Sequence, residues 1–366
     1  MIYGLCADMH CHAWSLFSKP LAGGLNSRLD GMLKEFARLC EHTKDAGGKR
    51  VYIAGDVFHV RGNLKTSVLN PTVATFIEMA EEHDLEIRIM PGNHDLEGAE
   101  VSWLGASVVS MAQAVGDEAP KVTVVLEPTF FEDDMVAVVP WQNTREGLLK
   151  AIAEVSDRII NDGECLSSVD LHLHTGINGV LVGMPDHGWS PEELAAFGFK
   201  RVFCGHYHNH KVFEVPTPGG MTATTEIVSI GALTHQTWGD VSTTAGWILV
   251  DETEFRQTES NTPKFMDFDE SYSPDDYTGN YVRVRGLSME EDEIRELKQA
   301  LEDTGAYGVV IHAVAKSKVI TRNGKVAGDA VKVEQSITEW IEAAELDDGK
   351  SVEAAALDVL NEARLA

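Results

Sequence analysis

Short apolar runs rich in β-branched residues alternate, over about the first two thirds of the chain, with stretches in which apolar residues recur every three or four positions. The first pattern predicts buried strands and the second predicts amphipathic helices. Helices are expected around residues 29–40, 73–80 and 144–160, the first with Asn26 or Ser27 as its N-cap. This alternation indicates a layered α/β domain with sites at the carboxyl ends of strands. The strands are expected at residues 2–7, 50–54, 86–90, 122–126, 135–139, 169–174 and 201–204.

The pattern changes after residue 204, where the remaining elements are expected to complete a first domain over residues 1–256. Its last strands are expected at 211–215, 226–230 and 245–250. Residues 257–279 are polar and acidic and are expected to be a linker. A small second α/β unit is then expected at 280–335 and amphipathic helices at 336–366. Within this unit the expected elements are a helix at 291–301 and strands at 281–285, 308–315 and 325–333.

Composition narrows the class of protein. The chain has 366 residues and is 43% hydrophobic, which suits a globular protein with a substantial core. No apolar run reaches about 18 residues, so no contact with a membrane is expected, and the first residues predict a strand rather than a signal peptide. The five cysteines form no CxxC pair, which favours a reducing, cytoplasmic setting.

The net charge of the chain affects whether it is expected to bind nucleic acid. A formal charge of −28 argues against a nucleic-acid partner, because duplex DNA is itself a dense polyanion. Solubility is the simpler explanation of such a charge. Bound divalent cations change the local potential, however, so the total charge is a warning and does not decide the matter.

Five short polar motifs occur in order, and four of them directly follow an expected strand. Taken singly, each has an ordinary interpretation as a turn, a helix cap or surface histidines. Together they indicate one site, because strand ends converge on one edge of a sheet. The motifs are Asp8-x-His10, Gly55-Asp56, Gly92-Asn93-His94-Asp95, His172-x-His174 and Gly205-His206-x-His208.

These residue types suit a pair of divalent cations. Carboxylate, imidazole and amide ligands without thiolates favour manganese, iron or a similar ion over a structural zinc. A carboxylate central to the set would bridge both ions. Two such ions lower the pKa of a water and clamp the attacking and leaving oxygens at phosphorus, so the motifs predict a metal-dependent phosphoesterase.

The five motifs resemble the signature of the calcineurin-like metallophosphoesterases, and the resemblance covers about residues 1–255. It implies a layered αββα-type core and two divalent cations, with Mn²⁺ the expected ion. One cation would be held by Asp8, His10, Asp56 and His208. Asp56 would bridge to a second cation held by Asn93, His206 and a strand-end histidine. His94 would contact the scissile phosphate and help to protonate the leaving oxygen, with Asp95 orienting it.

The resemblance leaves two assignments open, and the chain departs from the family pattern at one turn. His172 and His174 point the same way in a strand, and either could be the strand-end ligand; His174 is preferred because Thr175-Gly176 follows it. His59 could contact the phosphate or be a solvated surface histidine. The family's usual Gly-Ser turn late in the domain is Gly231-Ala232 here.

Two further segments resemble the SbcD-type DNA double-strand-break repair nucleases. They are Gly55-Asp56-Val57-Phe58-His59 and Thr262-Pro263-Lys264-Phe265-Met266-Asp267. This resemblance implies a DNA exo/endonuclease, possible as a homodimer, whose C-terminal helices dock on an SbcC-like SMC-type ATPase. The resemblance also makes the small α/β unit at 280–335 a capping domain. A basic ribbon in it, with Arg283 and Arg285 nearby, could contact DNA phosphates, although without the resemblance a solvated surface is the slightly favoured explanation. The ribbon consists of Lys316, Lys318, Arg322 and Lys325.

Two alternatives compete with a nuclease. The same core could serve a phosphomonoesterase or a cyclic-nucleotide phosphodiesterase acting on small substrates, or a scaffold that keeps the fold without catalysis. The scaffold hypothesis is weak because every expected ligand and His94 are present. Tryptophans such as Trp14 and Trp141 could line a nucleic-acid groove, although core packing is their commoner use.

Overall fold

The computed structural model describes residues 1–98, 121–181, 183, 187–216, 224–269, 271, 273–315, 333–344 and 348–365. The chain divides into two compact units. The first consists of Met1–Gly286 and Ile294–His312, and the second of Leu287–Glu293 and Ala313–Ala366.

One six-stranded sheet carries the N-terminal half of the fold, in the order β12-β11-β1-β2-β3-β4. The four strands from β1 to β4 run parallel, and β11 and β12 extend the β1 edge antiparallel. The register places Tyr3 opposite Arg50 and Arg50 opposite Glu86, so these strands end at similar heights. The strands are β1 (Tyr3–Cys6), β2 (Arg50–Ala54), β3 (Glu86–Met90), β4 (Val122–Val124), β11 (Gly246–Val250) and β12 (Phe255–Glu259).

A second six-stranded sheet has the order β5-β6-β7-β8-β10-β9. Its four inner strands are parallel, and an antiparallel strand closes each edge. This sheet therefore also gathers its inner strand ends on one side. The strands are β5 (Thr129–Phe131), β6 (Val136–Val139), β7 (Asp170–His174), β8 (Arg201–Gly205), β9 (Lys211–Pro216) and β10 (Thr224–Ser229).

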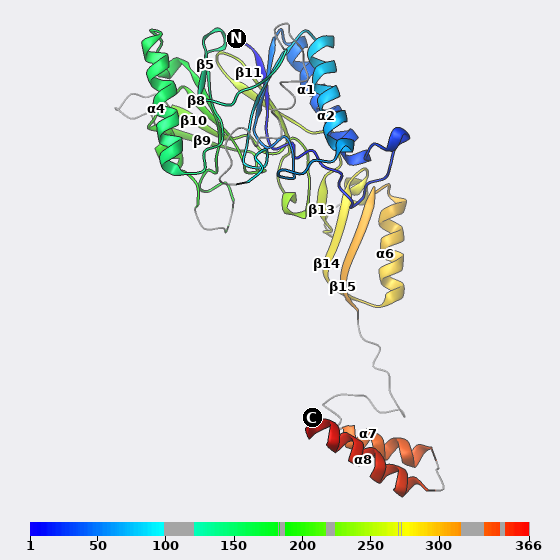
Figure 1. Cartoon of the computed structure of the whole chain (residues 1–366). Coiled ribbons are helices and arrows are strands. Elements are labelled where there is room, and N and C mark those ends of the chain that lie inside the picture. The colour runs from blue at the N-terminus through cyan, green and yellow to red at the C-terminus, as the bar shows by residue number, and fades with distance from the viewer. Residues whose placement is uncertain are drawn as a thin grey trace. The chain divides into compact units, whose positions relative to one another are not determined.

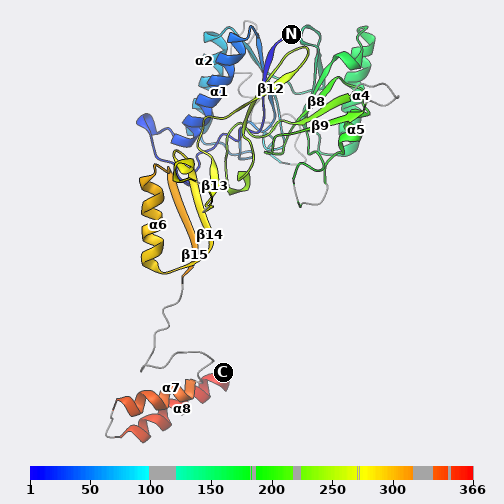
Figure 2. The ribbon, with the colours of Figure 1, turned by 180° about the vertical axis from the view of Figure 1, so that it is seen from behind.

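The two sheets pack face to face and helices cover their outer faces, which gives four layers (Figures 1 and 2). Between the sheets lies a buried cluster that includes Leu5, Val138 and Phe203. Helices α1 (Ser27–Asp45) and α2 (Thr66–Glu82) bury their apolar faces against the first sheet. Helices α4 (Arg145–Asn161) and α5 (Pro191–Ala195) do so against the second. The predicted layered α/β core is confirmed.

The helix starts follow local sequence signals. The side chain of Asn26 accepts hydrogen bonds from the N–H groups of Arg28 and Leu29, which caps α1. Thr144 caps α4 by accepting from the N–H of Gly147. Such caps satisfy N–H groups that have no partner within the helix. Asn26, one of the two residues expected at this position, is the N-cap of α1.

The segment predicted to be a linker, residues 257–279, carries regular structure, so that prediction was wrong. Its first residues belong to β12, and β13 (Phe265–Asp267) pairs parallel with β14 (Tyr281–Met289). Strand β12 escaped prediction because it is an edge strand with no fully buried residue, and such a strand shows little apolar alternation. β13 is only three residues long.

The β13-β14-β15 sheet has α6 beside it, as Figure 1 shows. Helix α6 spans Glu291–Asp303 and β15 spans Gly308–Ala315. Both match the prediction for the capping domain. The strand expected at 325–333 falls mostly outside the described residues.

Two helices, α7 (Val333–Ala343) and α8 (Gly349–Leu365), form a hairpin near the C-terminus. The hydroxyl of Thr338 donates to Glu353 across the pair at 2.6 Å. Trp340 and Val359 remain exposed although both are large and apolar. Among the described helices, none is long and apolar enough to cross a membrane.

A buried ionic network ties the two sheets together at the end away from the strand-end motifs. Asp170 on β7 accepts from Arg201 on β8 through both oxygens, at 2.7 and 2.6 Å, and from the hydroxyl of Tyr3 on β1 at 2.9 Å. All three residues are buried. A buried ion pair is costly to break because the remaining charge has no partner.

Replacing Asp170 by alanine is expected to lower the free energy of unfolding by about 3–5 kcal/mol, since Arg201 would stay buried without its carboxylate. Urea unfolding followed by circular dichroism measures this loss. The exposed pair of Glu254 with Arg256 provides a control, and Glu254→Ala should cost far less. Equal losses in the two variants would show that the Asp170 network contributes no more than a surface pair.

Candidate metal centre

The strand-end motifs meet where both sheets end. Asp8 follows β1, Asp56 follows β2 and Asn93 follows β3 in the first sheet. His174 is the last residue of β7 and His206 follows β8 in the second. Each sheet therefore contributes part of one polar cluster, as the order of the motifs predicted.

One group of ligand atoms comes from Asp8, His10 and His208, whose atoms lie within 4.8 Å of one another. Both carboxylate oxygens of Asp8 accept from the N–H of His206, at 3.1 and 2.9 Å. His208 donates its Nδ1 proton to Asp240 at 2.9 Å, which leaves Nε2 with a lone pair for a cation.

A second group comes from Asp56, His174 and His206, also within 4.8 Å. The Oδ1 atom of Asn93 lies 3.2 Å from Nε2 of His174 and 3.0 Å from Nδ1 of His206. His174 donates from Nδ1 to the carbonyl of Ala54 at 2.8 Å, so its Nε2 is the nitrogen that faces the cluster.

Asp56 lies between the two groups. Its Oδ2 atom is 3.3 Å from Nε2 of His174 and 3.6 Å from Nε2 of His10. Its Oδ1 atom accepts from the N–H of His94 at 2.8 Å. His10 also belongs to a third group of possible ligands, with His59 and His94. The arrangement fits a carboxylate shared by two cations.

The backbone is strained at four of these positions. The φ values are positive: 50° at Asp8, 48° at His10, 54° at Asp56 and 104° at His206. Residues other than glycine rarely adopt positive φ values. Such residues cost about 1–3 kcal/mol each and persist only when the surroundings hold them. Here the N–H groups of Asp8 and His10 bond the carbonyls of Gly55 and Asp56, at 3.0 and 2.9 Å. The strained backbone lowers the stability of the fold but directs these side chains toward one point.

Position 92 must be glycine because the backbone there passes very close to Asp56. A Cβ atom there would overlap Oδ1 and the backbone nitrogen of Asp56. The Gly92-Asn93 turn can therefore pass directly beside the shared carboxylate, which brings Asn93 and His94 to the cluster.

The donor set fits divalent cations. Asp8 and Asp56 are two almost completely buried carboxylates, and Nδ1 of His10 is buried with no hydrogen-bond partner among the described residues. Buried charges of one sign are unfavourable unless a positive charge is close. Oxygen and imidazole ligands without sulfur suit Mn²⁺, Fe²⁺ or similar ions.

The pKa shifts of Asp8, Asp56 and His174 also indicate that the buried carboxylates of the cluster favour a nearby positive charge. Burial raises the pKa of Asp8 to about 6 although His174 lowers it. Burial also opposes ionisation of Asp56, but His174 outweighs it and holds the pKa of Asp56 below its usual range. Burial works against a proton on His174, yet Asp56 raises the pKa of His174 to about 9. A bound divalent cation would supply positive charge beside Asp56.

His94 has an orienting partner that the sequence did not predict. Its Nδ1 donates to the carbonyl of His59 at 2.8 Å, which leaves Nε2 available. Asp95, predicted to orient His94, accepts from the N–H groups of Gly92, Val57 and Phe58, at 2.9, 3.3 and 3.1 Å. Asp95 thus holds the two loops that carry Asp56 and Asn93. The ring of His59 stacks on His94, with centroids 5.8 Å apart.

His172, the other candidate for the strand-end ligand, lies between the sheets. Its Nε2 is 3.2 Å from the hydroxyl of Tyr3, and its ring contacts Tyr52 and Phe203. Only His174 of the pair reaches the second ligand group.

The basic ribbon predicted to contact DNA, Lys316, Lys318, Arg322 and Lys325, lies outside the described residues. Arg283 and Arg285, which added to the basic character of this region, both pair with Asp267, at 2.7 and 2.6 Å. The single charge of Asp267 offsets one of the two positive charges, so this pair of arginines keeps a net positive charge.

Two supporting residues were missed by the sequence analysis. Asp240, in the short 3₁₀ helix Trp238–Asp240, accepts from His208 and from the N–H groups of Gln236 and Thr237. Gln236 donates from Nε2 to the carbonyl of Asp8 at 2.7 Å. Neither residue belongs to a strand-end motif, and both act on residues more than 30 positions away.

Replacing Asp240 by alanine is expected to weaken binding of the cation near Asp8 by about 10- to 100-fold, the usual cost of removing a carboxylate that orients a metal-bound histidine. Isothermal titration with Mn²⁺ measures the change. The melting temperature without metal serves as the control for folding. An unchanged affinity would exclude the orienting role.

Residues 1–210 match the family model of the calcineurin-like phosphoesterases. No curated protein matches the chain. Similar solved structures include the TT1561 protein of Thermus thermophilus at 15% identity and a dimetal phosphatase from Danio rerio at 9%. Each comparison covers 71% of this chain and 99% of the other, with a TM-score of 0.42. At these identities and scores, neither structure informs the activity of this chain.

Proposed function

The chain belongs to the calcineurin-like phosphoesterase family, and from this premise we propose that it is a two-metal phosphodiesterase that cuts DNA. One observation carries the proposal: two groups of ligand atoms, one with Asp8 and one with His174, adjoin the same carboxylate of Asp56. The SbcD-type branch is the proposed place of the chain within the family.

The proposed division of labour follows from the geometry. Asp8, His10 and His208 would hold one ion, Asn93, His174 and His206 the other, and Asp56 both. When bound, such ions supply Lewis acidity that neutralises phosphate charge and lowers the pKa of water. Manganese is the proposed ion.

His94 is the proposed acid for the leaving oxygen. The carbonyl of His59 accepts from its Nδ1, so Nε2 is the nitrogen that would carry the transferred proton. Its ring contacts that of His10, with centroids 4.7 Å apart, which sets His94 directly beside the first ligand group.

Aromatic rings on both flanks of the cluster support a nucleic-acid substrate. Trp141 stacks on His206 with centroids 5.5 Å apart, and Trp14 contacts His59 at 4.6 Å. Both tryptophans are partly exposed. Exposed rings beside a phosphate-binding centre favour stacking with bases, which is independent of sequence.

The hairpin of α7 and α8 is the proposed contact with an SMC-type ATPase. Exposed Trp340 and Val359 provide apolar surface on it. Copurification of the full chain with such an ATPase, compared with the Trp340→Glu variant, tests the contact. Sedimentation of the chain alone tests the proposed homodimer. The cytoplasmic setting stays a prediction.

The activity is tested with purified protein and Mn²⁺ on end-labelled DNA, beside p-nitrophenyl phosphate and bis-p-nitrophenyl phosphate. Cleavage of DNA and of the diester, abolished by EDTA, is expected. Hydrolysis of the monoester with intact DNA would contradict the nuclease and favour a phosphomonoesterase. No hydrolysis of any substrate with metal bound would favour a scaffold.

A further inference from the structure

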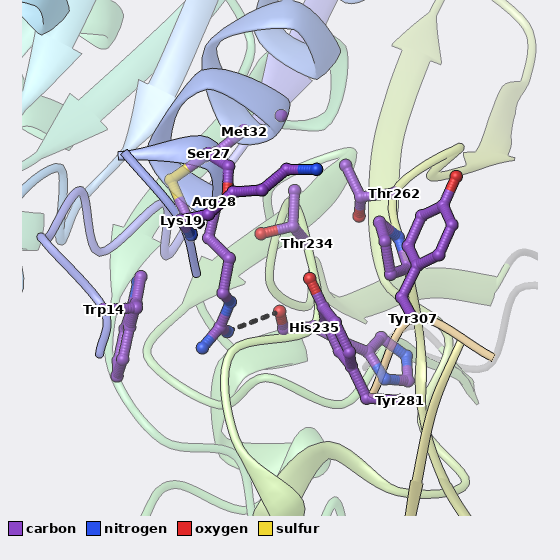
Figure 3. Close-up of a pocket in the computed structure, with 12 residues that line it drawn as sticks. Trp14, Lys19, Ser27, Arg28, Met32, Thr234, His235, Thr262, Tyr281 and Tyr307 are labelled. Carbon is purple, nitrogen blue, oxygen red and sulfur yellow. Dashed lines mark hydrogen bonds between the residues drawn. The ribbon is translucent and has the colours of Figure 1, made fainter. Parts of the chain in front are cut away.

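A cavity lined by apolar, aromatic and a few cationic side chains lies close to the metal centre in the first unit. It has a volume of about 210 Å³, and its walls come from segments far apart in sequence, including Trp14, Arg28, His235 and Tyr281. Figure 3 shows the guanidinium of Arg28, the hydroxyl of Tyr281 and the side chain of Thr234 around one space. None of these residues belongs to the proposed ligand sets.

The cavity is positively charged in a strongly acidic chain. Among the described residues, no carboxylate forms an ion pair with Arg28 or with Lys19, which also lines the cavity. Arginines elsewhere, such as Arg201 and Arg88, pair with buried carboxylates. Asp240 acts on Arg28 through space but forms no ion pair with it, because its carboxylate is bonded to His208 and to backbone N–H groups. The guanidinium can therefore pair with an external anion.

Arg28 is held in place but keeps donors to spare. It donates to the carbonyls of Gln236, Leu16 and His235, at 2.5, 3.3 and 3.5 Å. Its guanidinium lies over the rings of Trp14, Phe265 and Tyr281, at 5.0, 5.1 and 5.7 Å. A guanidinium has five N–H donors, so these contacts do not exhaust it. The group is thus preorganised for a further acceptor.

Two hydroxyl groups in the cavity wall also lack acceptors. Neither the phenol of Tyr281 nor the hydroxyl of Thr234 forms a hydrogen bond within the part of the chain that the structure describes, although both residues are largely buried. Neither oxygen is among the fully enclosed polar atoms that lack a partner, so both hydroxyls face the cavity and water can reach them. A ligand with several acceptor oxygens would take the place of that water.

Trp14 connects the cavity to the metal centre. Arg28 lies over its ring, and the ring contacts His59, which in turn contacts His10 with centroids 5.3 Å apart. A single aromatic wall therefore separates the cationic cavity from the site proposed for phosphodiester cleavage.

From this juxtaposition we propose that the cavity binds a phosphate group of the nucleic-acid strand being cleaved, one that neighbours the reacting phosphate. Arg28 and Lys19 supply the charge, and Tyr281 and Thr234 supply donors to the phosphate oxygens. The proposal rests on the proposed nuclease function and names how the strand is held. It also accounts for strand binding by an acidic chain, because the contact is local.

The test measures binding without metal, so that it does not depend on cleavage. Wild type, Lys19→Ala and Tyr281→Phe are titrated in EDTA with a short labelled oligothymidylate, by fluorescence anisotropy, and with thymidine 5′-monophosphate, by calorimetry. Lys150→Ala, which removes an exposed lysine on α4, is the matched control. Hydrolysis of bis-p-nitrophenyl phosphate with Mn²⁺ checks the metal centre in each variant.

Lys19→Ala is expected to weaken strand binding roughly tenfold and to reduce the slope of log K against log salt by about 0.7, the value for one phosphate contact on a single strand. Tyr281→Phe should weaken binding by a smaller factor. Both should hydrolyse the small diester like wild type. If both bind the strand like Lys150→Ala, the proposal is overturned. Weaker binding of the mononucleotide alone would also overturn it, since a free nucleotide would then be the ligand.

These outcomes are separable from those of the nuclease assay. A protein that binds the strand through Lys19 but never cuts DNA would refute the proposed function and leave the cavity assigned. A protein that cuts DNA, and whose Lys19→Ala and Tyr281→Phe variants bind the strand like wild type, would support the nuclease function and refute the proposed role of the cavity.

Discussion

Asp56→Asn is expected to reduce metal-dependent phosphodiester hydrolysis by about a thousandfold or more. Asparagine keeps the shape of the side chain but removes the charge that both ligand groups adjoin. Charge stabilisation by a bound ion is worth several kcal/mol in the transition state, and each ~1.4 kcal/mol is tenfold in rate. The same oxygen of Asp56 lies 3.6 Å from Nε2 of His10 and 3.3 Å from Nε2 of His174.

The loss can be measured as a rate and as metal binding. Bis-p-nitrophenyl phosphate with saturating Mn²⁺ gives the rate. Thermal unfolding with increasing Mn²⁺ gives the binding, because an ion that binds only the folded state raises its stability by mass action. Wild type should show a melting temperature that rises with Mn²⁺, and Asp56→Asn should lose most of this rise.

Asp157→Asn is the matched control, since it makes the same chemical change at an exposed position on α4. It should leave both the rate and the Mn²⁺-dependent melting unchanged. A wild-type rate or a full Mn²⁺ response in Asp56→Asn would contradict a shared carboxylate at this position.

Local patterns explain why most of the cluster was predictable from sequence. Asp8, Asp56 and Asn93 follow strands whose apolar runs are unmistakable, and parallel strands in register end at one edge. Motif order and strand direction together bring such residues to one place without knowledge of the packing.

The choice between His172 and His174 required the tertiary structure. Alternation places both side chains on the same face of β7, so periodicity treats them alike. The packed sheets distinguish them, because His172 is covered by Tyr3 and Tyr52 while His174 lies where the sheets end.

The residues that orient the ligands and His94 could not be predicted from the sequence, because their contacts also depend on tertiary packing. Asp240 bonds His208 from a 3₁₀ helix 32 positions away, and the carbonyl of His59 accepts from Nδ1 of His94. A backbone carbonyl has no signature in sequence, and a single buried aspartate in a loop resembles a helix cap. Such contacts appear only when loops from different strands are packed together.

His94→Gln is expected to lower the rate on DNA by about 100- to 10,000-fold, the usual contribution of a general acid, while leaving Mn²⁺-dependent melting intact. The proposed proton donor is Nε2, held in place by the bond of Nδ1 to the carbonyl of His59. Glutamine is polar and of similar length but does not carry a proton to transfer.

The leaving group separates this role from simple contact with the phosphate. Cleavage of DNA expels an alkoxide, which needs a proton as it departs, whereas bis-p-nitrophenyl phosphate expels a stabilised phenolate that leaves without one. General-acid catalysis matters only where the leaving oxygen must be protonated in the transition state. The loss should therefore be much larger on a thymidine dinucleotide or DNA than on the activated diester.

Comparing the two substrates in wild type and in His94→Gln is thus the decisive measurement, with Mn²⁺ saturating in each assay. Equal losses on both would assign His94 to positioning the phosphate, and no loss on DNA would remove it from the chemistry. A loss confined to the unactivated substrate is the result expected of Nε2 as the proton donor, since His94 adjoins the ligand group around His10 without belonging to the two ligand sets that share Asp56.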